Sequence, residues 1–289
     1  MKRESASTPV IVRKVANLKK AVDPSALTGK SVLITGGASG IGALIATTFC
    51  EHGARVTIAD INEQQGKAFV QELELKGLSA NLIATDVTEW NSQVQAFKSA
   101  IAFSGSNSVD IVVAAAGLPG ADFISPKDES PTLDCDPPEP RLAGSTLDVN
   151  IKGVYFTSKL AQHYFALPST LSDTAKKTPR KSLIVISSLA GYLELNAADY
   201  TASKWAVRGI FRSIRSMMED RGYRVNLIAP WVMDTPMSKS LAETCRQHGI
   251  PVGEAQSVAD AVVQCAADDS ICGQTAQPSI PGLYADADP

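Results

Sequence analysis

The chain has 289 residues, of which 44% are hydrophobic and 20% charged, and its formal net charge is −3. A chain of this length can bury a substantial core without disulfide or metal staples, and the weak negative charge leaves no broad basic field for nucleic acid. No run approaches the ~20 apolar residues of a membrane span, which argues against membrane insertion.

The cysteines form an odd set with neither CxxC nor Cys/His metal spacing. They are Cys50, Cys135, Cys245, Cys265 and Cys272. Reduced thiols in a cytoplasmic protein are the simplest interpretation of this set. We therefore expect no disulfide framework and no metal site.

Residues 1–27 are rich in lysine and arginine and precede the first predicted strand. They lack the strong arginine bias and the long apolar stretch of targeting segments, so we interpret them as a flexible or surface-docked N-terminal extension. Residues 28–289 are expected to form one domain.

Short β-branched runs alternate with helical patterns along the rest of the chain. The predicted strands cover 31–35, 55–59, 80–85, 110–116, 182–187 and 224–229, and the predicted helices cover 41–52, 62–76, 89–103, 145–165 and 200–221. This alternation indicates βαβ units. Because the strands are continuously apolar, helices should cover both faces of the sheet. The predicted fold is α/β, a Rossmann-type doubly wound parallel sheet in three αβα layers.

Two segments interrupt the alternation of strands and helices. Residues 118–142 are rich in proline and acidic side chains and cannot form a regular helix, and residues 168–181 are polar. We interpret both segments as loop insertions on the surface, of which the first could also border a substrate cleft.

A glycine-rich turn follows the first predicted strand, where Gly36, Gly40 and Gly42 lead into a helix. Glycines at such a turn let the backbone approach a pyrophosphate, and the helix N-terminus supplies N–H donors. An ordinary strand-to-helix turn is the alternative. Three glycines at this junction favour a dinucleotide-binding loop.

Aspartates end the next two predicted strands. Asp60 can accept hydrogen bonds from the adenosine ribose hydroxyls and would repel a 2′-phosphate. No lysine or arginine occurs at 61–66, so we predict NAD rather than NADP as the cofactor. Asp86 suits either the adenine edge or the cap of the helix that begins near Glu89, and both alternatives stay open.

Tyr200 and Lys204 are four residues apart, so they lie on one face of a helix. An ammonium beside a phenol stabilises the phenolate, which can then accept a proton from an alcohol. A YxxxK pair alone is frequent by chance on exposed helices. The pair gains weight from Ser187 and Ser188, which end a predicted strand at the edge where open α/β sheets bind ligands.

A serine hydroxyl at this edge can hold a substrate oxygen and stabilise the charge that develops on it. Asn150 stands among apolar residues in the middle of a predicted helix, which is an unusual position for asparagine. Its amide could bend the helix, or it could hold a water that relays protons through Lys204.

In this order, Thr35-Gly36-x-x-x-Gly40-x-Gly42, Asp60, Asp86, Asn150, Ser188 and Tyr200-x-x-x-Lys204 resemble the short-chain dehydrogenase/reductase family over residues 28–240. The resemblance implies that Asn150, Ser188, Tyr200 and Lys204 form a catalytic tetrad. Tyr200 would be the general acid/base and Ser188 would polarise the substrate oxygen. Lys204 would bind the nicotinamide ribose and Asn150 would hold the relay water.

The resemblance also implies a set of cofactor contacts along the carboxyl edge of the sheet. These residues are Gly36, Ser39, Gly40, Ile41, Gly42, Asp60, Asp86, Val87, Ala116, Gly117, Tyr200, Lys204, Pro230, Met233 and Thr235. Within the family, the chain is similar to NAD-dependent secondary-alcohol dehydrogenases, including prostaglandin-dehydrogenase-like enzymes and those of fungal secondary metabolism.

The chain departs from the family pattern in three places. The usual Asn-Ala-Gly motif after the fourth strand reads Ala115-Ala116-Gly117, and the glycine that usually follows Pro230 is Trp231. The gap from Ser188 to Tyr200 is one residue short. Ser187 would restore the count, but the SxxG spacing to Gly191 selects Ser188.

The residues expected around the substrate pocket are apolar or aromatic, namely Tyr192, Leu193, Leu195, Trp231, Met233 and Met237. Such a lining predicts a hydrophobic secondary alcohol or ketone as the substrate. We predict reversible hydride transfer between NAD(H) and this substrate. The alternatives are a biosynthetic NAD(P)H-dependent ketoreductase and a cofactor-binding sensor or scaffold without turnover. The family resemblance further implies a homodimer or homotetramer paired through helices 145–165 and 200–221.

Overall fold

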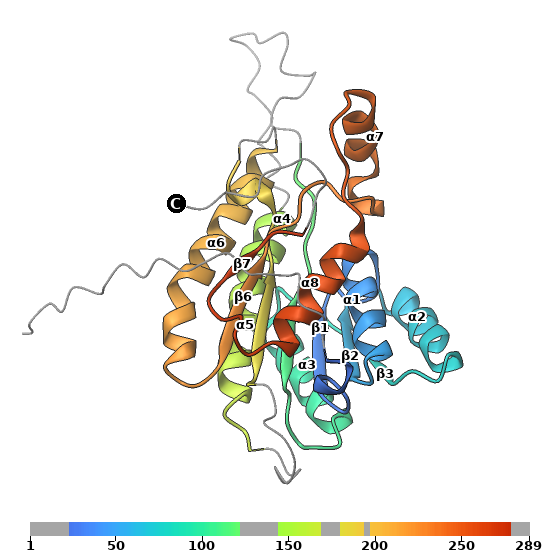
Figure 1. Cartoon of the computed structure of the whole chain (residues 1–289), viewed down its shortest axis with the longest axis vertical. Helices are drawn as coiled ribbons and strands as arrows, with labels where there is room; N and C mark the ends of the chain where they lie inside the picture. Colours follow the sequence, from blue (N-terminus) through green and yellow to red (C-terminus); the bar gives the residue numbers. More distant parts are fainter. Residues whose placement is uncertain (1–22, 122–143, 169–179, 194–196, 279–289) are drawn as a thin grey trace, which may run out of the picture.

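The computed structural model of the protein describes residues 23–121, 144–168, 180–193 and 197–278. Its centre is a parallel sheet in the order β3-β2-β1-β4-β5-β6-β7 (Figure 1). The strands are β1 (Ser31–Thr35), β2 (Arg55–Asp60), β3 (Ala80–Ala84), β4 (Ile111–Ala114), β5 (Ser182–Ile186), β6 (Arg224–Ile228) and β7 (Thr275–Ala276). The predicted Rossmann-type doubly wound fold is therefore confirmed.

The connecting segments are mostly helical. The helices are α1 (Gly40–Glu51), α2 (Glu63–Leu75), α3 (Trp90–Phe103), α4 (Gly144–Leu147), α5 (Val154–Tyr164), α6 (Ala198–Glu219), α7 (Lys239–Gln247) and α8 (Ala255–Ala267). A π-helical segment, Asp148–Gly153, joins α4 to α5, and short 3₁₀ turns cover Pro24–Ala26, Leu189–Gly191 and Pro236–Ser238.

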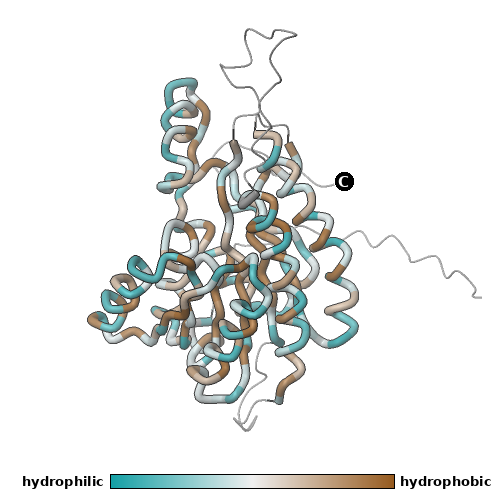
Figure 2. The backbone as a smooth tube through the Cα atoms, turned by 180° about the vertical axis from the view of Figure 1, so that it is seen from behind, coloured by the Kyte–Doolittle hydropathy of each residue, from teal (hydrophilic) through white to brown (hydrophobic). Residues whose placement is uncertain are grey.

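The core lies in two layers, one on each face of the sheet. In β1, Val32 and Ile34 pack with α1 and α8 on one face, whereas Leu33 packs with α3, α5 and α6 on the other. Side chains alternate between faces along a strand, so a continuously apolar strand feeds both layers. Each fully buried aliphatic or aromatic side chain contributes about 1.5–3 kcal/mol of transfer free energy. Figure 2 shows hydrophilic and hydrophobic residues alternating along the turns of the outer helices, as expected for helices that pack one face on the sheet.

The six predicted strands and five predicted helices occur with ends within two residues of the expected positions. Three elements were not predicted, namely α7, α8 and the edge strand β7. Strand β7 has only two residues, too few to produce a recognisable pattern, and it pairs with Leu227 and Ile228 of β6. The predicted helix 145–165 is divided by the π-helical segment that contains Asn150.

The described part of the chain begins at Asp23, five residues before the domain start expected at residue 28. Leu27, within the expected N-terminal extension, is completely buried in the core layer formed with α1 and α8. Residues 1–22 lie outside the described residues, and so do most of the two expected insertions, at 122–143 and 169–179.

The strand order places a switch point between β1 and β4. From β1 the chain moves outward to β2 and β3, and then returns to β4 on the other side of β1. In open α/β sheets, the crevice at the carboxyl ends of the strands at such a point is where ligands bind. The turns that follow β1 and β4 both begin at this crevice.

Candidate active site

The turn after β1 is built so that backbone approaches backbone. Gly36 has a φ of +68°, and a Cβ there would lie 2.6 Å from the Cα of Ala116. A Cβ on Gly42 would collide with the carbonyl oxygen of Gly36. The Thr35 hydroxyl accepts hydrogen bonds from the N–H groups of Ala115 at 3.2 Å and Ala116 at 3.4 Å. Glycine at 36 and 42 thus allows the turns after β1 and β4 to pack together.

The residues of this turn fit a dinucleotide pyrophosphate. Gly40 has a φ of +50° and open space where a Cβ would stand. Ser39, the N-cap residue of α1, makes no side-chain capping hydrogen bond, and its neighbours Ile41 and Gly42 belong to the first turn of the helix. A helix N-terminus whose N–H groups have no side-chain cap, with free space beside it, suits a phosphate group.

Asp60 ends β2 beside the glycine-rich turn and is half-buried. Its Oδ2 accepts a hydrogen bond from Ala38 N at 2.9 Å, and its Oδ1 accepts one from Asn62 N at 3.0 Å. The carboxylate is therefore held against the turn by backbone groups. Each carboxylate oxygen retains further acceptor capacity for a ribose hydroxyl.

Asp86 and Val87 follow β3. The Asp86 carboxylate accepts hydrogen bonds from Thr88 N at 2.8 Å and Thr88 Oγ1 at 2.7 Å, as in an Asx turn that leads toward α3. These contacts favour the local-turn interpretation of Asp86, although they leave its second oxygen for another partner. Val87 is 7% exposed and packs against Gly153, where a Cβ would lie 2.9 Å from Val87 Cγ2.

Tyr200 and Lys204 lie in the first turns of α6, as their spacing predicted. The Lys204 ammonium is 5.4 Å from the centroid of the Tyr200 ring. Lys204 is 5% exposed, and its Nζ donates to the carbonyl oxygen of Ile186 at 3.4 Å. A buried ammonium thus stands beside a half-buried phenol at the carboxyl end of β5.

Gly117 connects this pair to the turn after β4. A Cβ on Gly117 would lie 3.3 Å from Asn150 Oδ1 and 3.7 Å from Lys204 Nζ. The structure therefore brings together Gly117, Asn150, Tyr200 and Lys204, which come from three separate parts of the chain. Parallel strands converge at one edge, and this produces the cluster.

Asn150 is completely buried in the π-helical segment. Its Oδ1 accepts from Leu118 N at 2.8 Å, while its Nδ2 donates to Leu118 O at 3.1 Å and to Ser203 Oγ at 3.0 Å. The amide therefore binds the backbone after β4; both of its N–H donors are used, and Oδ1 keeps one acceptor site. The helix is π-helical where Asn150 stands, which fits one of the two alternatives given for this residue, a local distortion of the helix. Ser203 gave no sequence signal as a partner of Asn150.

The two adjacent serines have different surroundings. Ser187 is 3% exposed, and its hydroxyl lies 3.5 Å from the carbonyl oxygen of Lys204 inside the protein. Ser188 is half-buried; its Oγ accepts from Ala190 N at 3.1 Å and lies 3.5 Å from Pro230 O. Accessibility therefore favours Ser188 as the hydroxyl that meets a ligand.

The segment after β6 begins a flap that contains α7, here defined as residues 232–253. The indole Nε1 of Trp231 donates to Pro251 O at 3.0 Å, and Gly253 N donates to Val232 O at 2.9 Å. Met233 is 2% exposed and forms a β-bridge with Gly253. These contacts close the base of the flap, from which α7 projects (Figure 1).

Thr235 is the N-cap residue of the 3₁₀ turn Pro236–Ser238 at the start of this flap, and its hydroxyl lies 2.7 Å from Ser238 Oγ. The expected pocket residues divide into two groups. Leu193 and Met237 are 43% and 53% exposed, respectively. Tyr192 is half-buried, with its ring centroid 3.9 Å from Arg208 Cζ and its hydroxyl 3.2 Å from Thr275 Oγ1. Leu195 lies outside the described residues.

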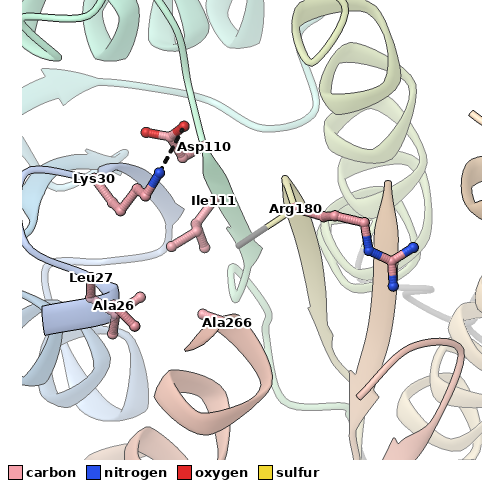
Figure 3. Close-up of a pocket in the computed structure, with 7 residues that line it drawn as sticks. All are labelled: Ala26, Leu27, Lys30, Asp110, Ile111, Arg180 and Ala266. Atoms are coloured by element: carbon pink, nitrogen blue, oxygen red, sulfur yellow. Dashed lines mark ion pairs between the residues drawn. The ribbon is translucent and has the colours of Figure 1, made fainter. Parts of the chain in front are cut away.

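Figure 3 shows a small crevice at the opposite, amino edge of the sheet, with Lys30, Asp110 and Arg180 among its lining residues. Lys30 Nζ and Asp110 Oδ1 are 4.0 Å apart, and Asp110 Oδ2 also accepts from Ser31 N. Arg180 N donates to Asp269 Oδ1. The Arg180 guanidinium donates to Asp269 O at 3.2 Å, so the polar groups of the crevice have partners within the protein and the crevice fits a structural role.

In the described part of the chain, no group of three or more histidine, cysteine, aspartate or glutamate side chains could hold a metal ion. No helix among the described residues is long and apolar enough to cross a membrane.

Three features define a dinucleotide-dependent oxidoreductase. They are a parallel sheet with a switch point, a glycine-rich turn at the crevice of that sheet, and a buried lysine beside a tyrosine. The family model for short chain dehydrogenases matches residues 30–246. The chain belongs to the short-chain dehydrogenase family, as its motifs predicted. It is a dehydrogenase or ketoreductase that uses a nicotinamide cofactor and a small-molecule substrate.

Named relatives support this assignment. The chain is 40% identical to 5'-hydroxyaverantin dehydrogenase of Dothistroma septosporum over 87% of this chain and 82% of the relative. It is 32% identical to an NADP-dependent dehydrogenase of a Phoma species over 89% of this chain and 77% of the relative. Among solved structures, 3-hydroxyacyl-CoA dehydrogenase type-2 from Mycobacterium avium matches with a TM-score of 0.70 and 27% identity, covering 86% of this chain and 94% of that chain.

Proposed function

We propose that the protein transfers hydride reversibly between NAD(H) and a hydrophobic secondary alcohol or the corresponding ketone. The observation that carries the proposal is the buried Lys204 ammonium 5.4 Å from the Tyr200 ring, at the crevice formed by the carboxyl ends of the strands. A cation in this position stabilises the phenolate, so the tyrosine can take the hydroxyl proton of an alcohol.

Each residue of the tetrad has a separate task in this proposal. Tyr200 accepts the alcohol proton at its phenolic oxygen, and the Ser188 hydroxyl holds the substrate oxygen and stabilises its developing charge. Lys204 stabilises the phenolate and binds the nicotinamide ribose. The nicotinamide, when bound, accepts the hydride. Asn150 holds the Leu118 backbone in place beside Lys204.

A Tyr200→Phe variant tests the general acid/base. The change removes only the hydroxyl, so the fold and NADH binding should persist while kcat falls by a factor of about 100 or more. NADH formation with a panel of hydrophobic secondary alcohols and NADH binding by fluorescence titration measure the two effects. Tyr155→Phe, at an exposed tyrosine of α5, is the matched control. Full activity of Tyr200→Phe would refute the mechanism.

The preference for NAD over NADP rests on Asp60. Its carboxylate lies against the glycine-rich turn, and a 2′-phosphate there would meet a negative charge. Two relatives, at 32% and 33% identity, are named NADP-dependent dehydrogenases, which supports NADP(H) as the alternative cofactor.

We expect the wild type to show a higher kcat/KM with NAD than with NADP by a factor of about 10 or more, and Asp60→Asn to reduce this ratio. The substitution removes the negative charge but keeps an oxygen that can accept the Ala38 N–H. Equal kcat/KM values with the two cofactors in the wild type would exclude the NAD preference.

The substrate class is inferred from the flap. Met237 and Leu241 present large apolar side chains that are 53% and 48% exposed, which suits contact with an apolar substrate. Two relatives, at 40% and 38% identity, are named 5'-hydroxyaverantin dehydrogenases. Compounds similar to 5'-hydroxyaverantin are therefore the first candidates for a substrate screen. A sensor or scaffold role would require cofactor binding without turnover of any member of the panel.

A further inference from the structure

The backbone after β4 crosses the active site and is held there by side chains from three elements. We call residues Gly117–Ala121 the crossing segment. Asn150 of the π-helical segment binds both polar backbone groups of Leu118, and Thr146 of α4 donates its hydroxyl to Pro119 O at 3.0 Å. The third contact comes from Asp199, the residue immediately before Tyr200.

Asp199 joins the crossing segment to the first turn of α6. Its Oδ1 and Oδ2 each lie 3.2 Å from Ala121 N, which donates to the carboxylate. Its Oδ1 also accepts from Tyr200 N at 2.7 Å. One carboxylate therefore binds the backbone of the crossing segment and the backbone of the proposed catalytic tyrosine at the same time.

The start of α6 depends on this carboxylate. The N-cap residue is Ala197, which makes no side-chain capping hydrogen bond. The first N–H groups of a helix have no partner within the helix, and an uncapped first turn is prone to fray. Asp199 accepts from one of these groups, and its negative charge is favourable at the helix N-terminus.

Gly120 shows how closely the crossing segment packs on the tyrosine. A Cβ on Gly120 would lie 2.8 Å from Tyr200 Cβ and would collide with Asp199 Oδ1. Only a residue without a side chain fits between the crossing segment and α6. The position of Tyr200 is therefore coupled to the backbone after β4.

We propose that Asp199 is a positioning residue for Tyr200. It holds the first turn of α6 against the crossing segment, so that the phenol stays aligned with Ser188 and Lys204. The proposal rests on the proposed function of Tyr200, and Asp199 itself acts through the tyrosine. A displacement of about 1 Å at a reacting group can cost a factor of about 100 in rate, so this fixation should be visible in kcat.

Asp199→Ala and Asp199→Asn test the proposal. Asp199→Ala should lower kcat by a factor of about 10 to 100 while the dissociation constant of NADH stays within about twofold of the wild type. Asp199→Asn keeps one oxygen that can accept from Tyr200 N, so it should restore part of the lost kcat. Asp268→Ala is the matched control, because Asp268 Oδ1 accepts from Ser270 N at 2.9 Å away from the site.

Hydrogen exchange supplies a readout that does not depend on turnover. The Ala121 amide should exchange faster in Asp199→Ala than in the wild type and in Asp268→Ala. Gly120→Ala should also lower kcat. Its effect should be smaller in the Asp199→Ala background, because the added Cβ no longer collides with the Asp199 carboxylate.

The outcomes separate this proposal from the proposed function. Wild-type kcat in Asp199→Ala together with an inactive Tyr200→Phe would refute the positioning role alone. The positioning role would also be refuted if Asp199→Ala lost NADH binding in proportion to kcat, because that result indicates general damage to the fold. Full activity in Tyr200→Phe would overturn the proposed function and the positioning role with it.

Discussion

At the scale of single residues, two neighbouring serines after β5 occupy different environments. The Ser187 hydroxyl faces the Lys204 carbonyl oxygen at 3.5 Å in the interior, whereas Ser188 is half-buried beside Pro230 O. The spacing to Tyr200 selected Ser187, and the spacing to Gly191 selected Ser188. Burial is a property of the folded protein, so only the structure could favour one of them.

A comparison of Ser188→Ala with Ser187→Ala tests this choice. Ser188→Ala should lower kcat by a factor of about 100 or more, because it removes a hydroxyl that stabilises charge on the substrate oxygen. Ser187→Ala should leave kcat within a few-fold of the wild type and lower the melting temperature slightly. Steady-state rates and thermal melts measure both. The reverse order of kcat values would assign the catalysis to Ser187.

At the scale of elements, the flap depends on one side chain at its base. Trp231 contacts the core layers on both faces of the sheet and the small cluster of Val232, Ala242 and Cys245 within the flap. Its indole N–H also binds Pro251 O. The tryptophan that stands where glycine is usual thus joins the flap to the sheet. The sequence indicated an indole near the nicotinamide or the substrate mouth, but it did not indicate this hydrogen bond.

We expect Trp231→Phe to loosen the flap while the ring keeps its packing. Loss of the N–H donor removes about 1 kcal/mol, which corresponds to roughly a fivefold change in local opening. Amide exchange of residues 239–250 should accelerate and KM for the alcohol should rise, with little change in NADH binding. Trp205→Phe, at a half-exposed position on α6, is the control. Unchanged exchange in the flap would contradict the assigned contact.

At the scale of the whole molecule, buried thiols link stability to pH. Burial raises the pKa of the Cys50 and Cys265 thiols from 9.0 to about 12. An unfolded chain would ionise these thiols near pH 9, while the folded protein keeps them neutral. Their contribution to stability is therefore complete below pH 9 and declines as the pH rises from 9 toward 12.

The free energy of unfolding should thus fall with increasing pH above 9, by up to about 1.4 kcal/mol per pH unit for each thiol. Urea denaturation of the wild type and of Cys265→Ala at several pH values between 8 and 11 measures the contribution of the Cys265 thiol to this pH dependence. The alanine variant should be less stable at pH 8 but show a shallower decline. Parallel pH profiles would show that the Cys265 thiol does not contribute.

The expected homodimer or homotetramer stays a prediction at this scale. The helices that the family resemblance implies at the interface expose three large side chains, Tyr155 of α5 with Trp205 and Met217 of α6, which are 55%, 50% and 58% exposed.

The sequence by itself determined the strands, the glycine-rich turn and the Tyr200–Lys204 pair. These features depend on local periodicity and spacing, such as the apolar run of β1 or the four-residue step of a helix. It could not determine β7, which pairs with β6, or the contact of Asn150 with Leu118.

The tertiary structure alone decided which groups meet at the crevice. No local sequence pattern predicts the roles of Gly120 and Asp199 or the contact of Trp231 with Pro251. The partners of these residues lie on other elements of the fold. Hydrogen bonds between distant segments depend on where the sheet brings those segments, and no short stretch of sequence encodes that position.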